Sequence, residues 1–220
     1  MCGRVAVTLP NDAMAQLFAA APANDLPNPP NFNVCPTDQI AVVTGDEGRR
    51  KLRAMRWGFI PKWYKTPGDG PLLINARGET IAQKPAFAEA CQTRRCLIPV
   101  SGFYEWTKTP EGARLPWYIS AADGAPLVMA GVWQAWDKGD VPLITCAVVT
   151  TAANAQMSAI HKRMPVLLKP SEWGKWLGEE GRGAATLMRA AEADFLRFHR
   201  VDPAVNSNRA AGAQLIEPIE

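Results

Sequence analysis

The stretch RRCLIPVSGFYEW, residues 94–106, decides the fold because it combines Ile, Val and three aromatic residues. Such residues are enriched in β-strands, and turn residues commonly bound the strands that they form. The same signature recurs along the chain, where 19 Pro and 17 Gly punctuate short apolar runs. The other runs that predict strands are CGRVAVTL (2–9), QIAVVTG (39–45), KLRAMRWGF (51–59), PLLINAR (71–77), LPWYIS (115–120), PLVMAGVWQAW (126–136) and VPLITCAVVTT (141–151).

Helices are expected to be few and short. Asn11 and Asp12 are predicted to cap a helix over 13–21, and a loop is predicted over 21–34. Further helices are expected over 80–90, from Ser171 onward, and weakly around 184–198. The regular alternation of strands and helices that is typical of a parallel sheet is absent. We therefore predict one α+β domain over residues 1–220, with a curved, mostly antiparallel, barrel-like sheet and peripheral helices.

The composition is that of a globular protein with a full core. The 220 residues suit one domain of the usual ~100–200 residues, with a hydrophobic fraction of 47% and a charged fraction of 20%. The net charge of +3 permits an anionic partner without requiring one. No signal peptide is visible, and the apolar runs are far shorter than the ~20 residues needed to cross a bilayer, so a cytoplasmic location is predicted.

The cysteines and histidines argue against a metal centre and against a disulfide framework. The cysteine count is odd, no C-x-x-C pair occurs, and the chain contains only two histidines. We expect no metal and no cofactor. The cysteines are Cys2, Cys35, Cys91, Cys96 and Cys146.

Two strand-like stretches carry polar residues that a pure core would not need. Asn75 and Arg77 are two apart, so they face the same side of an extended strand. A turn Asn followed by a solvated Arg is the alternative. Glu105 stands between Tyr104 and Trp106, either on a wet face or in a desolvated pocket. In a pocket its pKa would rise, which would make it a candidate acid or base near neutral pH.

A third polar pair interrupts the apolar stretch AIHKRMPVLL (159–168), where His161 and Arg163 are again two apart. A single His is more often a hydrogen-bonded structural residue than a catalyst. A His also titrates near working pH, so His161 is a candidate for proton transfer. His199 has no comparable neighbours and is interpreted as a structural or surface residue.

The stretch MRWGFIPKW (55–63) combines Trp57, Phe59 and Trp63 with two basic residues around a glycine and a proline. Aromatic residues near a turn usually pack in the core or in a hairpin. They also resemble the stacking platforms with which proteins bind single-stranded nucleic acid. Composition alone leaves both interpretations open.

Taken together, these segments resemble the SRAP (SOS-response-associated peptidase) family, the abasic-site processing proteins that crosslink to damaged single-stranded DNA. Each motif alone is weak, but their order and spacing make the resemblance specific over nearly the whole chain. Cys35 departs from the small residue, often Ala, that we expect there, and residues 180–195 are less distinctive. The motifs are MCGR (1–4), NFNVCPT (31–37), MRWGFIPKW, INARGET (74–80), KPAF (84–87), RRCLIPVSGFYEW, HKRMPV (161–166) and Val205-Asn206.

The resemblance implies a role for individual residues. Cys2 would be the nucleophile once Met1 is removed, Asn75 and Glu105 would line the site, and His161 would transfer protons. The residues implied to bind DNA are Arg77 and Arg163 at phosphates, Arg4 as a weaker phosphate ligand, and Trp57, Phe59 and Pro36 against the bases beside the lesion. The implied partner is single-stranded DNA containing abasic sites, for which a monomer suffices. The implied location is the cytoplasm, with nucleoid association when the protein is bound to DNA.

The chemistry of an amino-terminal cysteine fits this role. An α-amine has a pKa of about 7.7–8.0, so on the order of a tenth is unprotonated at pH 7. It can condense with the aldehyde of a ring-opened abasic sugar, and the thiol can then close a stable thiazolidine ring. Glu105 and His161 would move the protons. The same imine permits weak lyase activity by β-elimination of the 3′ phosphate.

Two other classes of function remain open. An N-terminal nucleophile amidohydrolase, such as a glutaminase domain, also has a mature chain that starts with Cys-Gly, and its thiol attacks an amide. No second synthase or transferase segment is visible here, and MRWGFIPKW has no clear role in such an enzyme. The family name leaves room for a peptidase that exposes Cys2 by self-cleavage. A non-catalytic single-strand binder is the remaining alternative.

Overall fold

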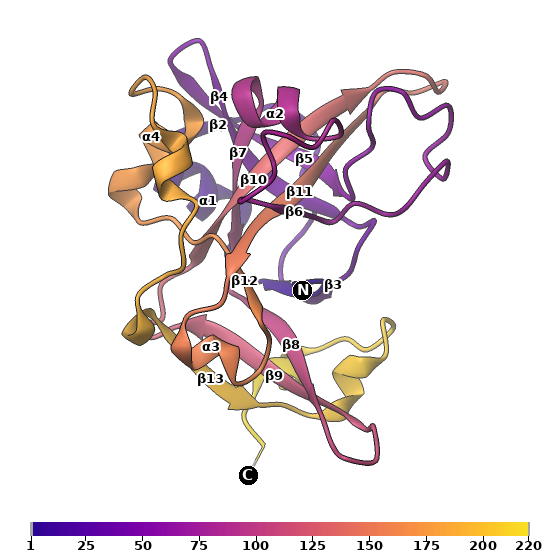
Figure 1. Ribbon diagram of the computed structural model, residues 1–220, viewed down its shortest axis with the longest axis vertical. Helices are drawn as coiled ribbons and strands as arrows, with labels where there is room; N and C mark the ends of the chain where they lie inside the picture. The colour runs from indigo at the N-terminus through magenta and orange to yellow at the C-terminus, as the bar shows by residue number, and fades with distance from the viewer. Residues whose placement is uncertain (1, 220) are drawn as a thin grey trace.

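Two β-sheets, one above the other in Figure 1, form the frame of the protein in a computed structural model that describes residues 2–219. The smaller sheet has the strand order β13-β9-β8-β1-β3. Its strands are β1 (Val5–Val7), β3 (Asn31–Val34), β8 (Gly102–Lys108), β9 (Arg114–Ala121) and β13 (Leu196–Arg200).

The larger sheet has the order β12-β11-β10-β7-β4-β5-β2, with β6 paired to β11. Most neighbours in it are antiparallel, but β2–β5, β5–β11 and β6–β11 are parallel. Its strands are β2 (Ala20–Pro22), β4 (Gln39–Asp46), β5 (Arg49–Trp57), β6 (Asn75–Arg77), β7 (Arg95–Val100), β10 (Leu127–Trp136), β11 (Leu143–Ala152) and β12 (Arg163–Pro165).

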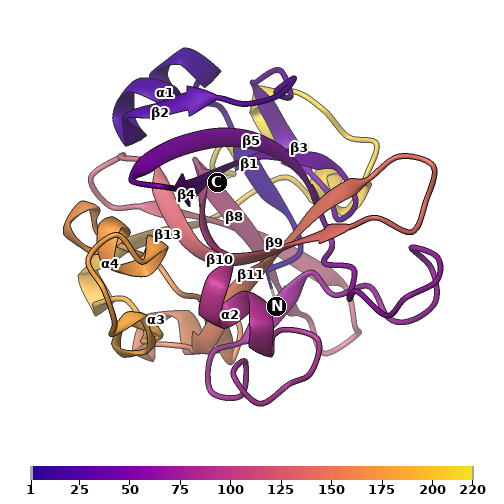
Figure 2. The ribbon, with the colours of Figure 1, turned by 90° about the horizontal axis from the view of Figure 1, so that it is seen from above.

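The larger sheet curves back on itself to form a ring. β5 pairs with β11 through Arg56–Thr145 and Trp57–Cys146, which joins the two ends of the series β11-β10-β7-β4-β5. Seen from above, these strands surround a common centre with the helices at the rim (Figure 2). The predicted curved, mostly antiparallel sheet with peripheral helices is therefore confirmed. The barrel-like closure is corrected to a ring held by one short parallel contact, with a separate smaller sheet beside it.

The stretch 94–106 forms the crossing from one sheet to the other, because β7 belongs to the larger sheet and β8 to the smaller one. The chain turns at Ser101, whose amide donates to the Ala6 carbonyl at 2.8 Å and whose hydroxyl accepts from the Thr8 amide at 2.9 Å. Gly102 follows, and a Cβ there would lie 2.6 Å from the Ile119 carbonyl oxygen. Only a glycine permits this close approach of β8 to β9.

Alternation along the strands places successive side chains in two different cores. In β7, Leu97 faces a core that the helices cover, together with Phe18 and Trp176. Cys96 and Ile98 face the second core, which the smaller sheet completes. Both faces of the larger sheet are thus buried, which explains its nearly continuous apolar runs.

The helices are shorter than predicted, and several boundaries are corrected. The helices are α1 (Asn11–Phe18), α2 (Ala88–Thr93), α3 (Ala155–Ser158) and α4 (Trp173–Leu177), with 3₁₀ turns at Pro170–Glu172, Ala184–Leu187, Ala193–Phe195, Pro203–Asn206 and Ala213–Ile216. Pro10 is the N-cap residue of α1 and no side chain caps it, so the predicted Asn11–Asp12 cap is wrong. The weak helix around 184–198 is replaced by 3₁₀ turns and β13, and the loop over 21–34 includes β3.

The five cysteines are free thiols. No helix within residues 2–219 is long and apolar enough to cross a membrane.

Candidate active site

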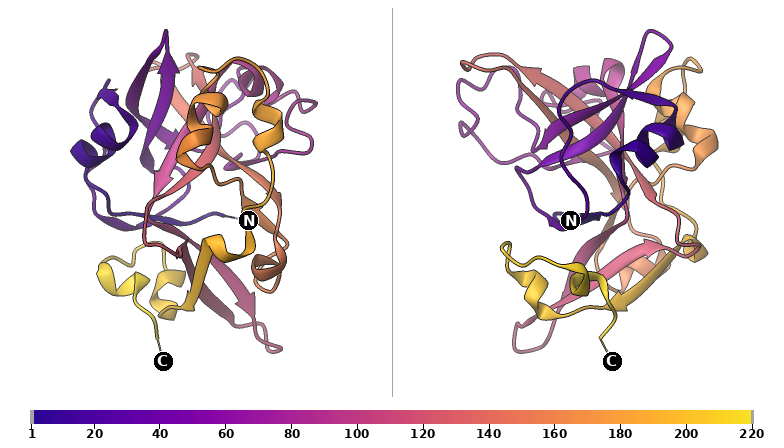
Figure 3. Two further views of the ribbon diagram at one scale, coloured as in Figure 1. Left: turned by 90° about the vertical axis from the view of Figure 1, so that its left-hand side faces the viewer. Right: turned by 180° about the vertical axis from the view of Figure 1, so that it is seen from behind.

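The amino-terminal segment runs along the seam between the two sheets, as the indigo strand in Figure 3 shows. β1 continues the smaller sheet, with Val5 opposite Phe103 of β8, and the Tyr104 amide donates to the Arg4 carbonyl at 2.9 Å. The residues before β1 therefore lie beside β8. Cys2 is only 1% exposed and belongs to the second core, which also contains Trp57.

The thiol of Cys2 is kept neutral by its surroundings. Burial raises its pKa above the ordinary value, and the nearby negative charge of Glu105 raises it further. A thiol of this kind is not ionised on its own at neutral pH, so its reaction requires a base close by.

Asn75 fixes the backbone of Cys2. Its side-chain amide donates to the Cys2 carbonyl oxygen at 2.9 Å. The parallel pairing of β6 with β11 sets the position of Asn75, which lies opposite Val148. The Asn75 Oδ1 atom is buried and has no hydrogen-bond partner among residues 2–219. Asn75 therefore holds the backbone of Cys2 and retains an acceptor atom without a partner among residues 2–219.

Glu105 is a buried carboxyl group, 4% exposed, on the face of β8 that carries Phe103. Its neighbour Tyr104 faces the opposite way and donates its hydroxyl to the Phe32 carbonyl at 2.7 Å. Burial raises the pKa of Glu105, and the positive charge of His161 acts in the opposite direction. The pocket alternative for Glu105 thus describes the structure, and the wet-face alternative does not.

His161 follows α3 and is held by its backbone and by its ring. Its amide donates to the Met157 carbonyl at 2.9 Å. Its Nδ1 atom lies 3.0 Å from the Arg163 amide nitrogen and 3.1 Å from the Arg163 carbonyl oxygen, so the Arg163 backbone fixes the orientation of the ring. Because the charge of His161 acts on Glu105, and that of Glu105 on Cys2, the structure brings the predicted catalytic residues together.

An open groove of about 470 Å³ leads to Glu105, and its lining is basic. Trp106 lies in it, with the Arg114 guanidinium 4.6 Å and the Arg4 guanidinium 5.9 Å from its ring centroid. The Trp106 ring nitrogen donates to Asn206 Oδ1 at 2.6 Å. The groove is lined by Gly3, Arg4, Glu105, Trp106, Lys108 and Arg114.

The predicted phosphate ligands have different surroundings. Arg77 is exposed at the end of β6, two residues after Asn75. Arg4 instead donates from Nη1 to Asn33 Oδ1 at 2.6 Å and to the Val205 carbonyl at 2.9 Å. Arg163 forms a two-point ion pair with Glu79, at 2.6 and 2.8 Å. Arg77 is therefore presented to a ligand, whereas Arg4 and Arg163 already hold protein partners.

The predicted stacking role of Trp57 and Phe59 is corrected, since both are core residues with 1% and 2% exposure. Trp57 donates its ring N–H to the Ile74 carbonyl at 3.1 Å, and the Phe59 ring lies 5.0 Å from that of Phe87. Trp63, in the same motif, is 55% exposed. Pro36 is half-buried in a turn whose next residue, Thr37, has a φ of 80°.

Sequence reasoning gave no role to Lys108, Arg114 or Asn206. Lys108 and Arg114 are opposite each other at the turn end of the β8–β9 hairpin. No local signal pointed to Lys108, because it is three residues from Glu105 and strand alternation alone would put the two side chains on opposite faces of β8. Asn206 belongs to the Val205-Asn206 motif, which now has a structural reason. Val205 holds Arg4, and Asn206 holds Trp106.

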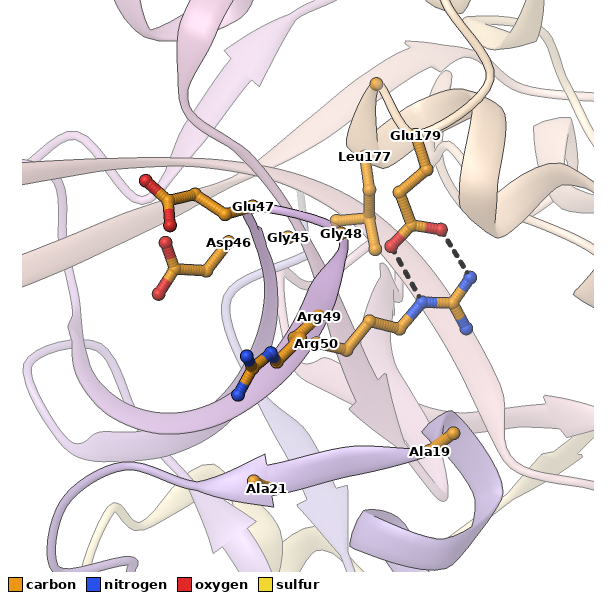
Figure 4. Close-up of a pocket in the computed structure, with 11 residues that line it drawn as sticks. Ala19, Ala21, Gly45, Asp46, Glu47, Gly48, Arg49, Arg50, Leu177 and Glu179 are labelled. Atoms are coloured by element: carbon orange, nitrogen blue, oxygen red, sulfur yellow. Dashed lines mark hydrogen bonds and ion pairs between the residues drawn. The ribbon is translucent and has the colours of Figure 1, made fainter.

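A cavity larger than this groove, about 930 Å³, lies elsewhere, between the β4–β5 hairpin and the end of α4 (Figure 4). Its charges are mostly paired: Arg50 donates to both carboxylate oxygens of Glu179, at 2.9 and 2.7 Å. It shares no lining residue with the groove at Glu105. No cluster of three or more metal-ligating side chains occurs within residues 2–219. We place the candidate site at the groove because Glu105, which lines it, lies close to Cys2 and His161.

The fold and the site define a mostly β protein in which an amino-terminal cysteine lies beside a basic groove. The chain belongs to the SOS response associated peptidase (SRAP) family, whose profile matches residues 1–208. It is 34% identical to the Bacillus subtilis "Abasic site processing protein YoaM", over 86% of this chain and 85% of that protein. It is 31% identical to the Escherichia coli "Abasic site processing protein YedK" over 100% of both.

Solved structures establish the fold independently. A crystal structure of a protein from Bacteroides thetaiotaomicron superposes with a TM-score of 0.87 at 21% identity, covering 100% of both chains. A second, from Bordetella bronchiseptica, gives a TM-score of 0.76 at 26% identity and covers 91% of this chain and 100% of the other.

Proposed function

We propose that this protein processes abasic sites in single-stranded DNA by forming a covalent crosslink through Cys2. The observation that carries the proposal is the buried Cys2, held by Asn75 and close to Glu105, which lines an open basic groove. Relatives that match most of this chain are named abasic site processing proteins, which supports the same substrate class.

The reaction begins when removal of Met1 gives Cys2 a free α-amine; Met1 lies outside the described residues. The amine attacks the aldehyde carbon of the ring-opened sugar, and loss of one water leaves an imine. The thiol sulfur then adds to the imine carbon while its proton passes to the imine nitrogen. The product is a thiazolidine ring, and one water is the only molecule released.

Glu105 and His161 move the protons in this sequence. The pKa of the Cys2 thiol is raised by burial, so the sulfur needs a base as it attacks, and the Glu105 carboxylate is the nearby acceptor. The raised pKa of Glu105 also makes its acid form available for protonating the leaving hydroxyl. His161 exchanges protons through Nε2. The unpaired Asn75 Oδ1 orients the amine or a sugar hydroxyl.

A side reaction competes with ring closure. The imine acidifies the adjacent C2′ protons, and a base in the site can then expel the 3′ phosphate by β-elimination. We expect this lyase activity to be weak, because the thiol of the same residue traps the imine first.

The DNA strand follows the basic groove. Lys108 and Arg114 contact phosphates on one side of the lesion, and Arg77 does so at the end of β6. The stacking role moves from Trp57 and Phe59 to Trp63, because a base can reach only an exposed ring. Phosphate contacts of this kind release counterions, so binding should weaken steeply with salt.

An amidohydrolase is the weaker alternative. In such an enzyme the α-amine of Cys2 would be the base, and the thiol must lose its proton to attack an amide. Here burial and a neighbouring carboxyl raise the pKa of Cys2, which opposes this loss. An imine is a far better electrophile than an amide, so a neutral thiol with a base close by suffices. Self-processing that exposes Cys2 is compatible with the crosslinking chemistry.

Intact-protein mass spectrometry after incubation with abasic single-stranded DNA tests the proposal. The expected mass is that of the chain without Met1, plus the oligonucleotide, minus one water. Cys2→Ser should retain imine formation, trapped by borohydride, but lose the crosslink that survives without reduction. An oligonucleotide with a tetrahydrofuran in place of the abasic sugar is the control, since it has no aldehyde. A chain that stays unmodified, or a Cys2→Ser crosslink as durable as that of the parent, would contradict the mechanism.

A further inference from the structure

Glu79 and Arg163 form a clamp between the two segments that carry Asn75 and His161. Glu79 follows β6, the strand of Asn75, and Arg163 begins β12, two residues after His161. The Arg163 guanidinium donates to both Glu79 carboxylate oxygens, at 2.6 and 2.8 Å. The same guanidinium donates to the Thr150 carbonyl oxygen at 2.8 Å and to its hydroxyl at 3.2 Å. Because Thr150 belongs to β11, the clamp also contacts that strand.

The ion pair between Glu79 and Arg163 is partly shielded from water, which strengthens the attraction between the two side chains. The Arg163 side chain is 13% exposed and that of Glu79 is 48% exposed. The hydrogen bonds from Arg163 lower the pKa of Glu79 to about 2, so the ion pair persists at every pH at which the protein would work. Paired N–H···O bonds of this kind fix the plane of the guanidinium as well as its distance.

The backbone of Arg163 in turn contacts the His161 ring at Nδ1, the nitrogen whose protonation distinguishes the two neutral tautomers. The Arg163 amide nitrogen lies 3.0 Å from His161 Nδ1, and the Arg163 carbonyl oxygen lies 3.1 Å from the same atom. The amide contact requires a lone pair on Nδ1 and puts the proton on Nε2. The carbonyl contact requires the proton on Nδ1. A small displacement of Arg163 would therefore change which tautomer is favoured.

We propose that Glu79 is a positioning residue for the crosslinking reaction: through Arg163 it holds His161 in the tautomer that carries its proton on Nε2. This inference rests on the proposed function for its rate measurement, but its structural measurement is independent of that function. It also gives Arg163 a role other than phosphate binding, because both of its terminal nitrogens already donate to Glu79.

The tautomer can be observed directly, since the chain contains only two histidines. Long-range ¹H–¹⁵N correlation spectra of protein labelled at histidine distinguish protonated from unprotonated ring nitrogens. His199 is the internal reference, because its Nε2 atom lies 2.7 Å from the Ile216 carbonyl oxygen and so donates to it. In the parent protein we expect both histidines to be protonated at Nε2 when neutral.

The decisive variant is Glu79→Gln, compared with Glu179→Gln as a matched control. Glu179 makes the same two-point contact with Arg50 in the cavity of Figure 4, away from the groove at Glu105. Glu79→Gln should move the His161 signals toward the Nδ1-protonated form and leave those of His199 unchanged. It should slow crosslinking by about ten-fold, part of the ~10²–10⁴ that a positioned acid–base group contributes. Glu179→Gln should change neither.

Affinity for tetrahydrofuran-containing single-stranded DNA separates this role from phosphate binding. If Glu79 positions His161, Glu79→Gln binds this DNA within two-fold of the parent, and Glu79→Asp recovers part of the rate. An unchanged His161 tautomer would overturn the proposal. So would a Glu79→Gln protein that binds DNA more tightly and crosslinks at the parent rate, since Arg163 would then be a phosphate ligand that Glu79 restrains. Failure of the parent to crosslink at all would refute the proposed function and leave the tautomer result standing.

Discussion

Phe59 and Trp63 belong to one motif, and the structure predicts opposite consequences for their truncation. Phe59 is 2% exposed and packs against Phe87, whereas Trp63 is 55% exposed. Phe59→Ala removes a buried ring, which typically costs about 3–5 kcal/mol in free energy of unfolding. For a domain of this size that corresponds to a fall in Tm of roughly 6–20 °C. Trp63→Ala leaves the core intact and should change Tm by less than about 2 °C, as surface substitutions do.

DNA binding should show the reverse pattern. Loss of a stacking ring costs about 1–3 kcal/mol of binding free energy per base, or roughly five- to 150-fold in Kd. Trp63→Ala should show this loss in fluorescence anisotropy with labelled single-stranded DNA. Phe59→Leu, which keeps most of the buried volume, should bind DNA like the parent at a temperature where both are folded. If Phe59→Leu lost DNA affinity while keeping its Tm, the assignment of Phe59 to the core would be wrong.

Three further predictions concern other parts of the molecule. Burial raises the pKa of Glu105, so its contribution to stability is complete below pH 4.5 and is lost as the pH rises through the raised pKa; Glu105→Gln should abolish this fall in denaturant titrations between pH 4 and 8. Gly131→Ala would place a Cβ 2.7 Å from Ile98 Cδ1 and 2.8 Å from Cys96 Sγ, and the overpacking should cost about 1–3 kcal/mol in free energy of unfolding. Gly68→Ala has open space and is the control, so equal losses in both variants would refute the packing argument. Arg114→Ala should weaken binding to single-stranded DNA of any sequence and reduce the slope of log Kd against log salt by about 0.7; an unchanged slope would show that Arg114 contacts no phosphate.

The strands were predictable from the sequence, but their partners were not. The runs 126–136 and 141–151 contain β10 and β11 almost residue for residue, because β-branched and aromatic content is a local property. Pairing is not local. The parallel contact of Trp57 with Cys146 that closes the ring joins residues 89 positions apart, with no signal in either run. The helix predicted over 80–90 forms only at Ala88–Thr93, where packing against β7 and β10 decides the outcome.

In the candidate site, too, local features were predictable from the sequence and long-range contacts were not. Asn75 and Glu105 were recognisable because each places a polar group in an apolar strand. Phe59 was assigned to the wrong environment, since an aromatic residue beside a turn has the same pattern whether it is buried or exposed. The Glu79–Arg163 pair spans 84 residues, and a Glu in a turn gives no sign of its distant partner.

The contacts that enclose the reactive end of the chain also set an order of events during synthesis. Arg4 is held by the Val205 carbonyl, 201 residues away, and Trp106 is held by Asn206. At a translation rate of about 5–20 residues per second, the first residues wait roughly 10–40 seconds before these partners exist. During that interval Cys2 lacks the enclosure that later leaves it 1% exposed. On the proposed mechanism, the enzyme that removes Met1 would therefore have its access while the chain is still growing, and the contacts of Val205 and Asn206 would form last.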